Sequence, residues 1–296
     1  MKLVKNIVFA GLVFGLFLLA QSCEKTPQNT QTDFKQDMAV VSDAQFPQQF
    51  ANQFILTFFK SIYDSTLINT GLSKIDSAKV MLNHVPDTLE IQVEYWYESE
   101  NNHWHHYDGN GHFRMGTFTY VMDTTFLTST TGSCSILVNK LFYFDSLPTN
   151  IQNISIEKTG LSDAGNQTFK ATFNNMVMSG TYTGKKTRTF SATFNYELFK
   201  DASTPYSSPD DYFLFTGNIE GNTNSDYTFN ITISDTNRYK IDYNCRYTIE
   251  GKSNVTISGG PVFFGNILLD YITEDGCDNF YQITFPEMFS TKSHIE

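Results

Sequence analysis

The sequence has little positive charge, few cysteines and no apolar run of the length that a comfortable membrane span needs. Lys and Arg number 20 against 31 Asp and Glu, and the formal charge is −11. This balance argues against nucleic acid as a partner, because phosphate backbones are bound by cationic surfaces. The length of 296 residues excludes a minimal disulfide-stapled scaffold and is enough to bury a sizeable core.

The common motifs of catalysis and phosphate binding are also missing. The chain contains no Gly-x-Ser-x-Gly elbow, no Gly-x-x-x-x-Gly-Lys loop, no His-Glu-x-x-His pair and no Gly-x-Gly-x-x-Gly turn. These absences lower the expectation of an enzyme without excluding one, and we predict no cofactor.

What the sequence does contain favours β-structure. Charged residues make up only 17%, whereas Phe (27) and Tyr (16) are abundant, a composition that suits pleated strands. Residues 89–99 alternate between apolar and polar, and Asp108-Gly109-Asn110-Gly111 is a hairpin signal, so the strands that flank it should pair antiparallel. Further strands are predicted at residues 112–122, 134–144, 152–158, 167–178, 187–199, 212–217, 226–234, 240–251, 253–258, 265–271 and 281–285. The predicted fold is all-β, an antiparallel meander that forms a sandwich or an open barrel.

One amphipathic helix is predicted before the strands, beginning at Ser42 or Asp43. Large apolar residues recur at the spacing of one helix face, and polar residues occupy the other. The apolar positions are Phe50, Phe54, Phe58 and Ile62, with Ile55, Phe59 and Tyr63; the polar ones are Gln49, Asn52, Gln53, Lys60 and Asp64. We expect the apolar face to pack against the sheet.

The N-terminus has the organisation of a secretory signal, with a basic start, an apolar run from Ile7 to Ala20 and small residues after it. The ending Leu19-Ala20-Gln21-Ser22-Cys23 resembles the lipobox of bacterial lipoproteins. That resemblance implies cleavage before Cys23 and acylation of this residue, for instance with palmitate. Several acyl chains would anchor the protein stably in a membrane. We expect an outer-membrane lipoprotein, on its periplasmic or cell-surface face.

The predicted organisation has three parts. Residues 1–22 form the signal peptide, and residues 23–43 form a flexible tether, because they are rich in Gln, Thr, Asn and Pro. Residues 44–296 form a single β-rich domain that includes the helix, since no composition break divides them.

Several segments resemble a family of uncharacterised Bacteroidota lipoproteins. The resemblance spans residues 87–289 and is carried by Tyr107-Asp108-Gly109-Asn110-Gly111-His112-Phe113-Arg114-Met115-Gly116, Asn244-Cys245-Arg246-Tyr247, Leu269-Asp270-Tyr271 and Asp275-Gly276-Cys277-Asp278-Asn279. It implies a lipid-anchored, β-rich protein and no transferable activity. The same resemblance implies a disulfide between Cys245 and Cys277. Cys134 then remains, and we expect it to be a small buried residue, because nothing near it in sequence supplies a base.

The segment around the Asp108–Gly111 turn carries the candidate site residues. Aromatic and imidazole side chains gather there, and they suit a binding surface for a protein, glycan or apolar ligand. The candidates are Trp96, Trp104, His103, His105, His106 and His112. A metal site there is stereochemically possible, but we expect none, because an exposed hairpin end offers few groups that could hydrogen-bond the far ring nitrogens of ligating histidines.

The leading hypothesis is a noncatalytic binding or structural platform on a lipid anchor in the cell envelope. The alternative is an envelope hydrolase that acts on glycans. It would use a histidine-bound metal or paired carboxylates among Glu94, Glu98 and Glu100.

Overall fold

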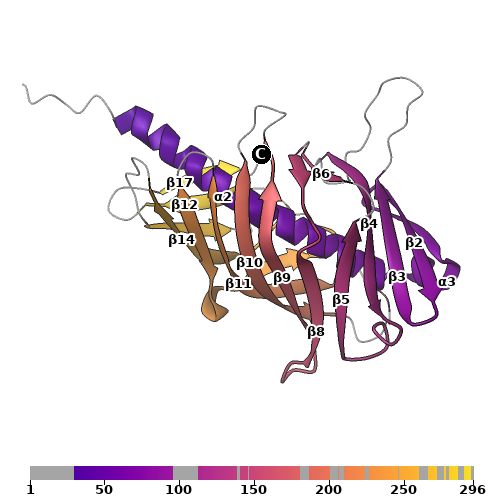
Figure 1. The fold of residues 1–296 in the computed structure, drawn as a ribbon. Coiled ribbons are helices and arrows are strands. Elements are labelled where there is room, and N and C mark those ends of the chain that lie inside the picture. Colours follow the sequence, from indigo (N-terminus) through magenta and orange to yellow (C-terminus); the bar gives the residue numbers. More distant parts are fainter. Residues whose placement is uncertain are drawn as a thin grey trace, which may run out of the picture. The chain divides into compact units, whose positions relative to one another are not determined.

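In the computed structural model (Figure 1), the described residues are 30–95, 113–138, 141–145, 147–180, 187–200, 206, 210–223, 227–245, 247–259, 266–271, 277, 280–285 and 290–294. Residues Val40–Glu296 form one compact unit, and residues Met1–Ala39 form another. The description below concerns the unit that begins at Val40.

Strands dominate this unit. The helices are α2 (Thr30–Ile62), α3 (Ser65–Thr70) and the short 3-10 helix η1 (Asp235–Asn237). The strands are β1 (Leu72–Ile75), β2 (Ala78–Val85), β3 (Thr88–Tyr95), β4 (Arg114–Asp123), β5 (Thr131–Val138), β6 (Phe142–Phe144), β7 (Leu147–Thr149), β8 (Ile154–Leu161), β9 (Gln167–Met178), β10 (Arg188–Phe199), β11 (Tyr212–Thr223), β12 (Thr228–Ile233), β13 (Tyr239–Asp242), β14 (Gly251–Ser258), β15 (Asn266–Tyr271), β16 (Phe280–Thr284) and β17 (Ser290–His294).

All of these strands belong to one antiparallel sheet, and neighbours in the chain are mostly neighbours in the sheet. Two strands each pair with two successive partners. Strand β4 pairs with both β5 and β6, and β11 pairs with both β12 and β13. Within the described residues β1 pairs with β2 and β17 pairs with β16, and no pairing joins β1 to β17. The predicted all-β antiparallel meander is confirmed.

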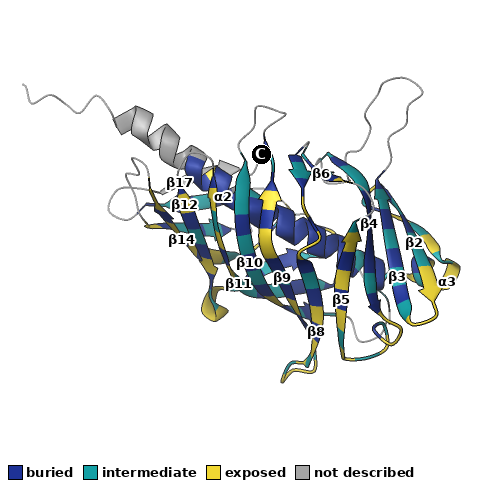
Figure 2. Ribbon diagram, viewed as in Figure 1, coloured by how far each residue is buried: buried dark blue, intermediate teal, exposed yellow. Residues whose placement is uncertain are grey.

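The sheet has one apolar face, because side chains alternate along each strand. In β3, Leu89, Ile91, Val93 and Tyr95 are buried, and the residues between them are half-buried. Figure 2 shows the same alternation of buried and exposed positions in the neighbouring strands. The inward face carries a core rich in phenylalanine and tyrosine.

Helix α2 lies against this inward face, and strands from distant parts of the sheet contact it. Phe54 stacks on Phe118 of β4 at 5.2 Å between ring centroids, and Phe59 stacks on Phe213 of β11 at 4.2 Å. Gln45 donates a hydrogen bond to the Tyr271 hydroxyl of β15 at 3.2 Å. The sheet therefore curves around the helix, and Figure 1 shows strands on more than one side of it.

One prediction about this helix is wrong. It begins at Thr30 rather than at Ser42 or Asp43, so the latter part of the predicted tether belongs to it. The polar side of the helix is also buried, since Gln49, Asn52 and Gln53 are 7%, 6% and 1% exposed. The curved sheet covers this side of the helix as well as the phenylalanine side.

Candidate functional site

The aromatic and histidine candidates lie outside the described residues. They are Trp96, Trp104, His103, His105, His106 and His112, and the predicted lipidation site Cys23 also lies outside. The strands on both sides of this segment are described, and β3 pairs with β4 in antiparallel register from Thr88 with Asp123 to Tyr95 with Gly116. The predicted antiparallel pairing of the two flanking strands is confirmed.

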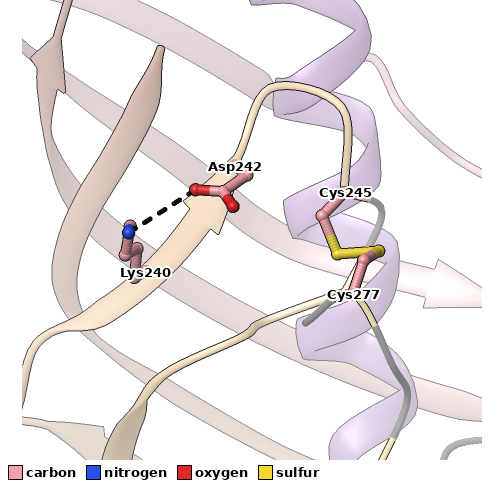
Figure 3. The surroundings of a disulfide bond; sticks show 4 residues. All are labelled: Lys240, Asp242, Cys245 and Cys277. Atoms are coloured by element: carbon pink, nitrogen blue, oxygen red, sulfur yellow. Dashed lines mark ion pairs between the residues drawn. A yellow bond between two sulfur atoms is a disulfide. The ribbon is translucent and has the colours of Figure 1, made fainter. Parts of the chain in front are cut away.

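The predicted disulfide is present (Figure 3). Cys245, in the turn after β13, is bonded to Cys277, which lies between β15 and β16, with 5.5 Å between their Cα atoms. Cys134 is the free, buried cysteine of the described residues. Burial raises the pKa of its thiol, which suits the small buried side chain that was expected here.

The carboxylate candidates are described only in part, because Glu98 and Glu100 lie outside the described residues. Glu94 stands on β3 between Lys79 and Thr117 in the strand register. No second carboxylate therefore directly opposes Glu94 in the described part of the sheet. Among the described residues, no group of three or more His, Cys, Asp or Glu side chains is arranged to hold a metal ion.

A groove lies on the outward face of the sheet, about 560 Å³ in volume. Its lining comes from β9, β10, β11, β12 and β14, and we call it the outer groove. The lining residues are Asn175, Val177, Thr189, Phe190, Ser191, Glu220, Gly221, Asn222, Thr228, Phe229, Asn230, Thr256 and Ser258.

Strand register arranges the polar residues of the outer groove in rows. One row runs across four strands as Thr189, Asn222, Thr228 and Ser258. The next row, two residues along each strand, is Ser191, Glu220, Asn230 and Thr256. Rows form because side chains directly opposite one another in antiparallel strands point to the same face.

A local irregularity shapes the groove. The pairing of β9 with β10 shifts register between Phe190 and Ala192, and Asn175 has a positive φ of 47° on the partner strand. Such bulges bend a sheet locally. On β11, a Cβ atom on Gly221 would lie 2.5 Å from the Thr189 carbonyl oxygen, so the close approach of the two strands requires glycine.

Hydrogen bonds within the rows hold the groove side chains in place. Thr189 donates to Asn222 across β10 and β11, and the hydroxyls of Thr228 and Ser258 lie 2.6 Å apart. The Thr256 hydroxyl donates to the amide oxygen of Asn266 at 3.1 Å. No sequence motif predicted this site. The alternating Thr, Asn and Ser residues are visible in the sequence, but only the register brings them together.

A second polar cluster lies inside the sheet, around Arg114. This residue is 2% exposed, and its guanidinium donates to the Gln53 side-chain oxygen at 2.7 Å, to the Tyr95 hydroxyl at 2.9 Å and to the Thr57 hydroxyl at 3.1 Å. The cluster joins α2 to β3 and β4. It is enclosed by the core, so its role is to fix the helix against the sheet.

A small enclosed cavity lies further along the same helix. Its lining residues are Gln45, Gln48, Gln49, Asn52, Tyr247, Thr248 and Tyr271, and its volume of about 10 Å³ is sized for the centre of one water molecule. Amide groups of the helix and hydroxyls of the sheet supply the polar surface of this cavity. This polar surface allows the glutamine-rich side of the helix to lie in the interior.

The strongest pKa shifts in the described residues reflect this interior. Burial raises the pKa of the Tyr120, Tyr196, Tyr239 and Tyr271 hydroxyls, all of which are buried in the core. Desolvation disfavours the charged phenolate, and this effect is enough to explain the raised pKa values. These tyrosines are structural.

Lys158 is the cation whose pKa is lowered most among the described residues. It is 5% exposed, and its ammonium donates to the backbone oxygens of Phe126 at 2.5 Å and Ser129 at 3.1 Å. Burial lowers its pKa to about 8. The side chain thereby holds the loop between β4 and β5 against β8.

Lys158 should make stability depend on pH. Between about pH 8 and its ordinary value of 10.5, the unfolded state binds more protons than the folded state, so folding stability rises with pH. The variant Lys158→Met retains the apolar stem and removes this titration. We expect the free energy of unfolding of the wild type, minus that of the variant, to increase from pH 7 to pH 10 in denaturant titrations. A difference that stays flat or decreases would contradict the assignment.

No protein-family model, curated protein or solved structure with which the chain was compared gives a match. Within the described part of the chain, no helix combines the length and the apolar character that crossing a membrane requires.

Proposed function

We propose that this chain is a lipid-anchored protein of the cell envelope that binds a ligand without catalysis, at the outer groove. The signal and the lipobox-like sequence before Cys23 support the anchor. The outer groove supports the binding role.

The single observation that carries the binding role is a groove of about 560 Å³ on a rigid surface. That volume lies within the range of known small-ligand sites. Strands β9, β10 and β11 each have 12 residues, and β10 is paired along its length with both neighbours. A surface built on paired strands loses little conformational entropy when a ligand binds.

The composition of the groove favours binding over hydrolysis. Glu220 is the one carboxylate among its described lining residues, whereas most glycoside hydrolases need a pair of carboxylates at the scissile bond. The remaining polar residues are amides and hydroxyls. These groups hold a ligand through hydrogen bonds but do not titrate near neutral pH.

The anchor can be tested at Cys23. We expect the mature chain to begin at this residue and to carry acyl chains, detected by mass spectrometry of the N-terminal peptide. Cys23→Ala should abolish both the modification and retention in the membrane fraction. Ser22→Ala is the matched control, because it keeps a small residue before the cysteine. An unmodified chain that begins elsewhere would refute the anchor.

Binding can be tested by placing a photoreactive amino acid at Thr256, in the outer groove. The same substitution at Thr159, an exposed outward position on β8, is the control. After irradiation of intact cells, we expect the Thr256 variant to gain a covalent adduct, detected as an increase in its mass, and the Thr159 variant to remain unmodified. Equal modification at both positions, or none at either, would refute binding at the groove.

A further inference from the structure

The ligand chemistry of the outer groove can be inferred from its charges. Its described polar lining consists of eight neutral side chains, Asn175, Thr189, Ser191, Asn222, Thr228, Asn230, Thr256 and Ser258, with the single carboxylate Glu220. No Lys, Arg or His is among these described lining residues. At these residues an anionic ligand would meet a carboxylate and no compensating cation, in a chain whose formal charge is −11.

The neutral groups offer donors and acceptors in close alternation. An asparagine side chain supplies both, and a threonine or serine hydroxyl does the same. Adjacent hydroxyls of a sugar ring present the same mixture of donors and acceptors. The rows that begin at Thr189 and Ser191 therefore match a polyhydroxylated ligand better than a charged or an apolar one.

The groove is also long enough for several sugar rings. It crosses β9, β10, β11, β12 and β14, and neighbouring strands lie roughly 4.8 Å apart, so its length is about 19 Å. Val177 is 39% exposed at one end, where it offers apolar surface to the C–H face of a ring. Hydrogen bonds within a row, such as Thr189 to Asn222, orient the polar side chains before binding.

We infer that the outer groove binds a neutral oligosaccharide chain laid across the strands. This inference rests on the proposed function, because it names the ligand class of the same site. Asn222 and Asn230 occupy the centre of the two rows and are the main hydrogen-bonding residues, and Glu220 between them accepts from sugar hydroxyls.

The test uses the full mature protein in detergent micelles and isothermal titration calorimetry. The probes are maltohexaose, cellohexaose, mannohexaose and xylohexaose, with hexagalacturonate as an anionic chain of equal length. We expect at least one neutral hexamer to bind and hexagalacturonate to bind more weakly. The double variant Asn222→Ala, Asn230→Ala should weaken the neutral hexamer at least about tenfold, because hydrogen-bonding groups on both rows are lost.

The control is the double variant Thr159→Ala, Thr168→Ala, which removes a hydrogen-bonded outward pair on β8 and β9, away from the groove. Its affinity for the hexamer should equal that of the wild type. Binding of hexagalacturonate at equal or higher affinity, no binding of any neutral hexamer, or an unchanged affinity in the Asn222 and Asn230 variant would each overturn the inference.

The crosslinking experiment at Thr256 distinguishes a wrong ligand class from a wrong proposed function. An adduct that contains no carbohydrate would leave the binding role in place and refute the sugar ligand. The absence of an adduct would refute both.

Discussion

Replacing Arg114 with alanine is expected to lower the free energy of unfolding by about 3 to 5 kcal/mol, because it removes the donor of a buried polar cluster. The side-chain oxygens of Gln53, Thr57 and Tyr95 would each lose their hydrogen bond from the guanidinium. The substitution also leaves space where the guanidinium lies 5.5 Å from the Phe144 ring. Denaturant titration would measure the loss.

Two further variants make this prediction specific. Arg114→Lys keeps the charge but lacks the planar fork that reaches several acceptors, so it should recover only part of the lost stability. Arg238→Ala is the control, since its ion pair with Glu197 lies at the surface, where Arg238 is 37% exposed, and such pairs contribute about 0 to 1 kcal/mol. If Arg114→Ala cost no more than Arg238→Ala, the cluster would not hold the helix to the sheet.

The sequence Arg114-Met115-Gly116 thus has a structural explanation. Arg114 ties β4 to α2, and Gly116 has a φ of 120°, a conformation that favours glycine. A Cβ atom on Gly116 would also lie 2.6 Å from the Leu141 carbonyl oxygen. Both residues serve the fold and lie on the strand that follows the candidate hairpin.

Strand periodicity predicted the long strands well, because each has one buried face. Residues 167–178 were predicted as a strand, and β9 has those bounds. By contrast, β1 and β2 were missed. Their turn is formed by Asp76 and Ser77, both with positive φ, where the sequence lacks the Asn-Gly or Asp-Gly pair that usually signals such a hairpin.

The predicted strand at residues 240–251 was too long, and its error has a physical cause. Strand β13 ends at Asp242, the chain turns through Cys245, and β14 begins at Gly251 with a φ of 118°. The apolar residues in this turn are buried by tertiary contacts, so their pattern resembles a continuous strand. Periodicity alone cannot separate the two cases.

The burial of the polar helix side and the position of the outer groove could not be predicted from the sequence, because both depend on how distant strands are arranged. Burial of Gln49 and Gln53 follows from the curvature of the whole sheet, and a single helix cannot reveal it. The outer groove needs the register of five strands before Asn222 and Asn230 line the same surface. The cysteine pair was predictable only because family resemblance placed Cys245 and Cys277 together.

Removal of that disulfide is expected to lower the free energy of unfolding by roughly 3 to 4 kcal/mol in the chain-entropy model. The bond closes a loop with a sequence separation of 32, which contains β14 and β15. In the double variant Cys245→Ser, Cys277→Ser the unfolded chain regains the freedom of this loop. Denaturant titration measures the change.

The loss of stability in this variant should differ between strands. Hydrogen exchange is expected to accelerate most in β14 and β15, whereas β9 and β10 remain protected by 10 matched residue pairs. Reduction of the wild type with dithiothreitol should reproduce the same pattern without any substitution. A stability change below about 1 kcal/mol would show that the loop is ordered by its own packing, with the disulfide contributing little.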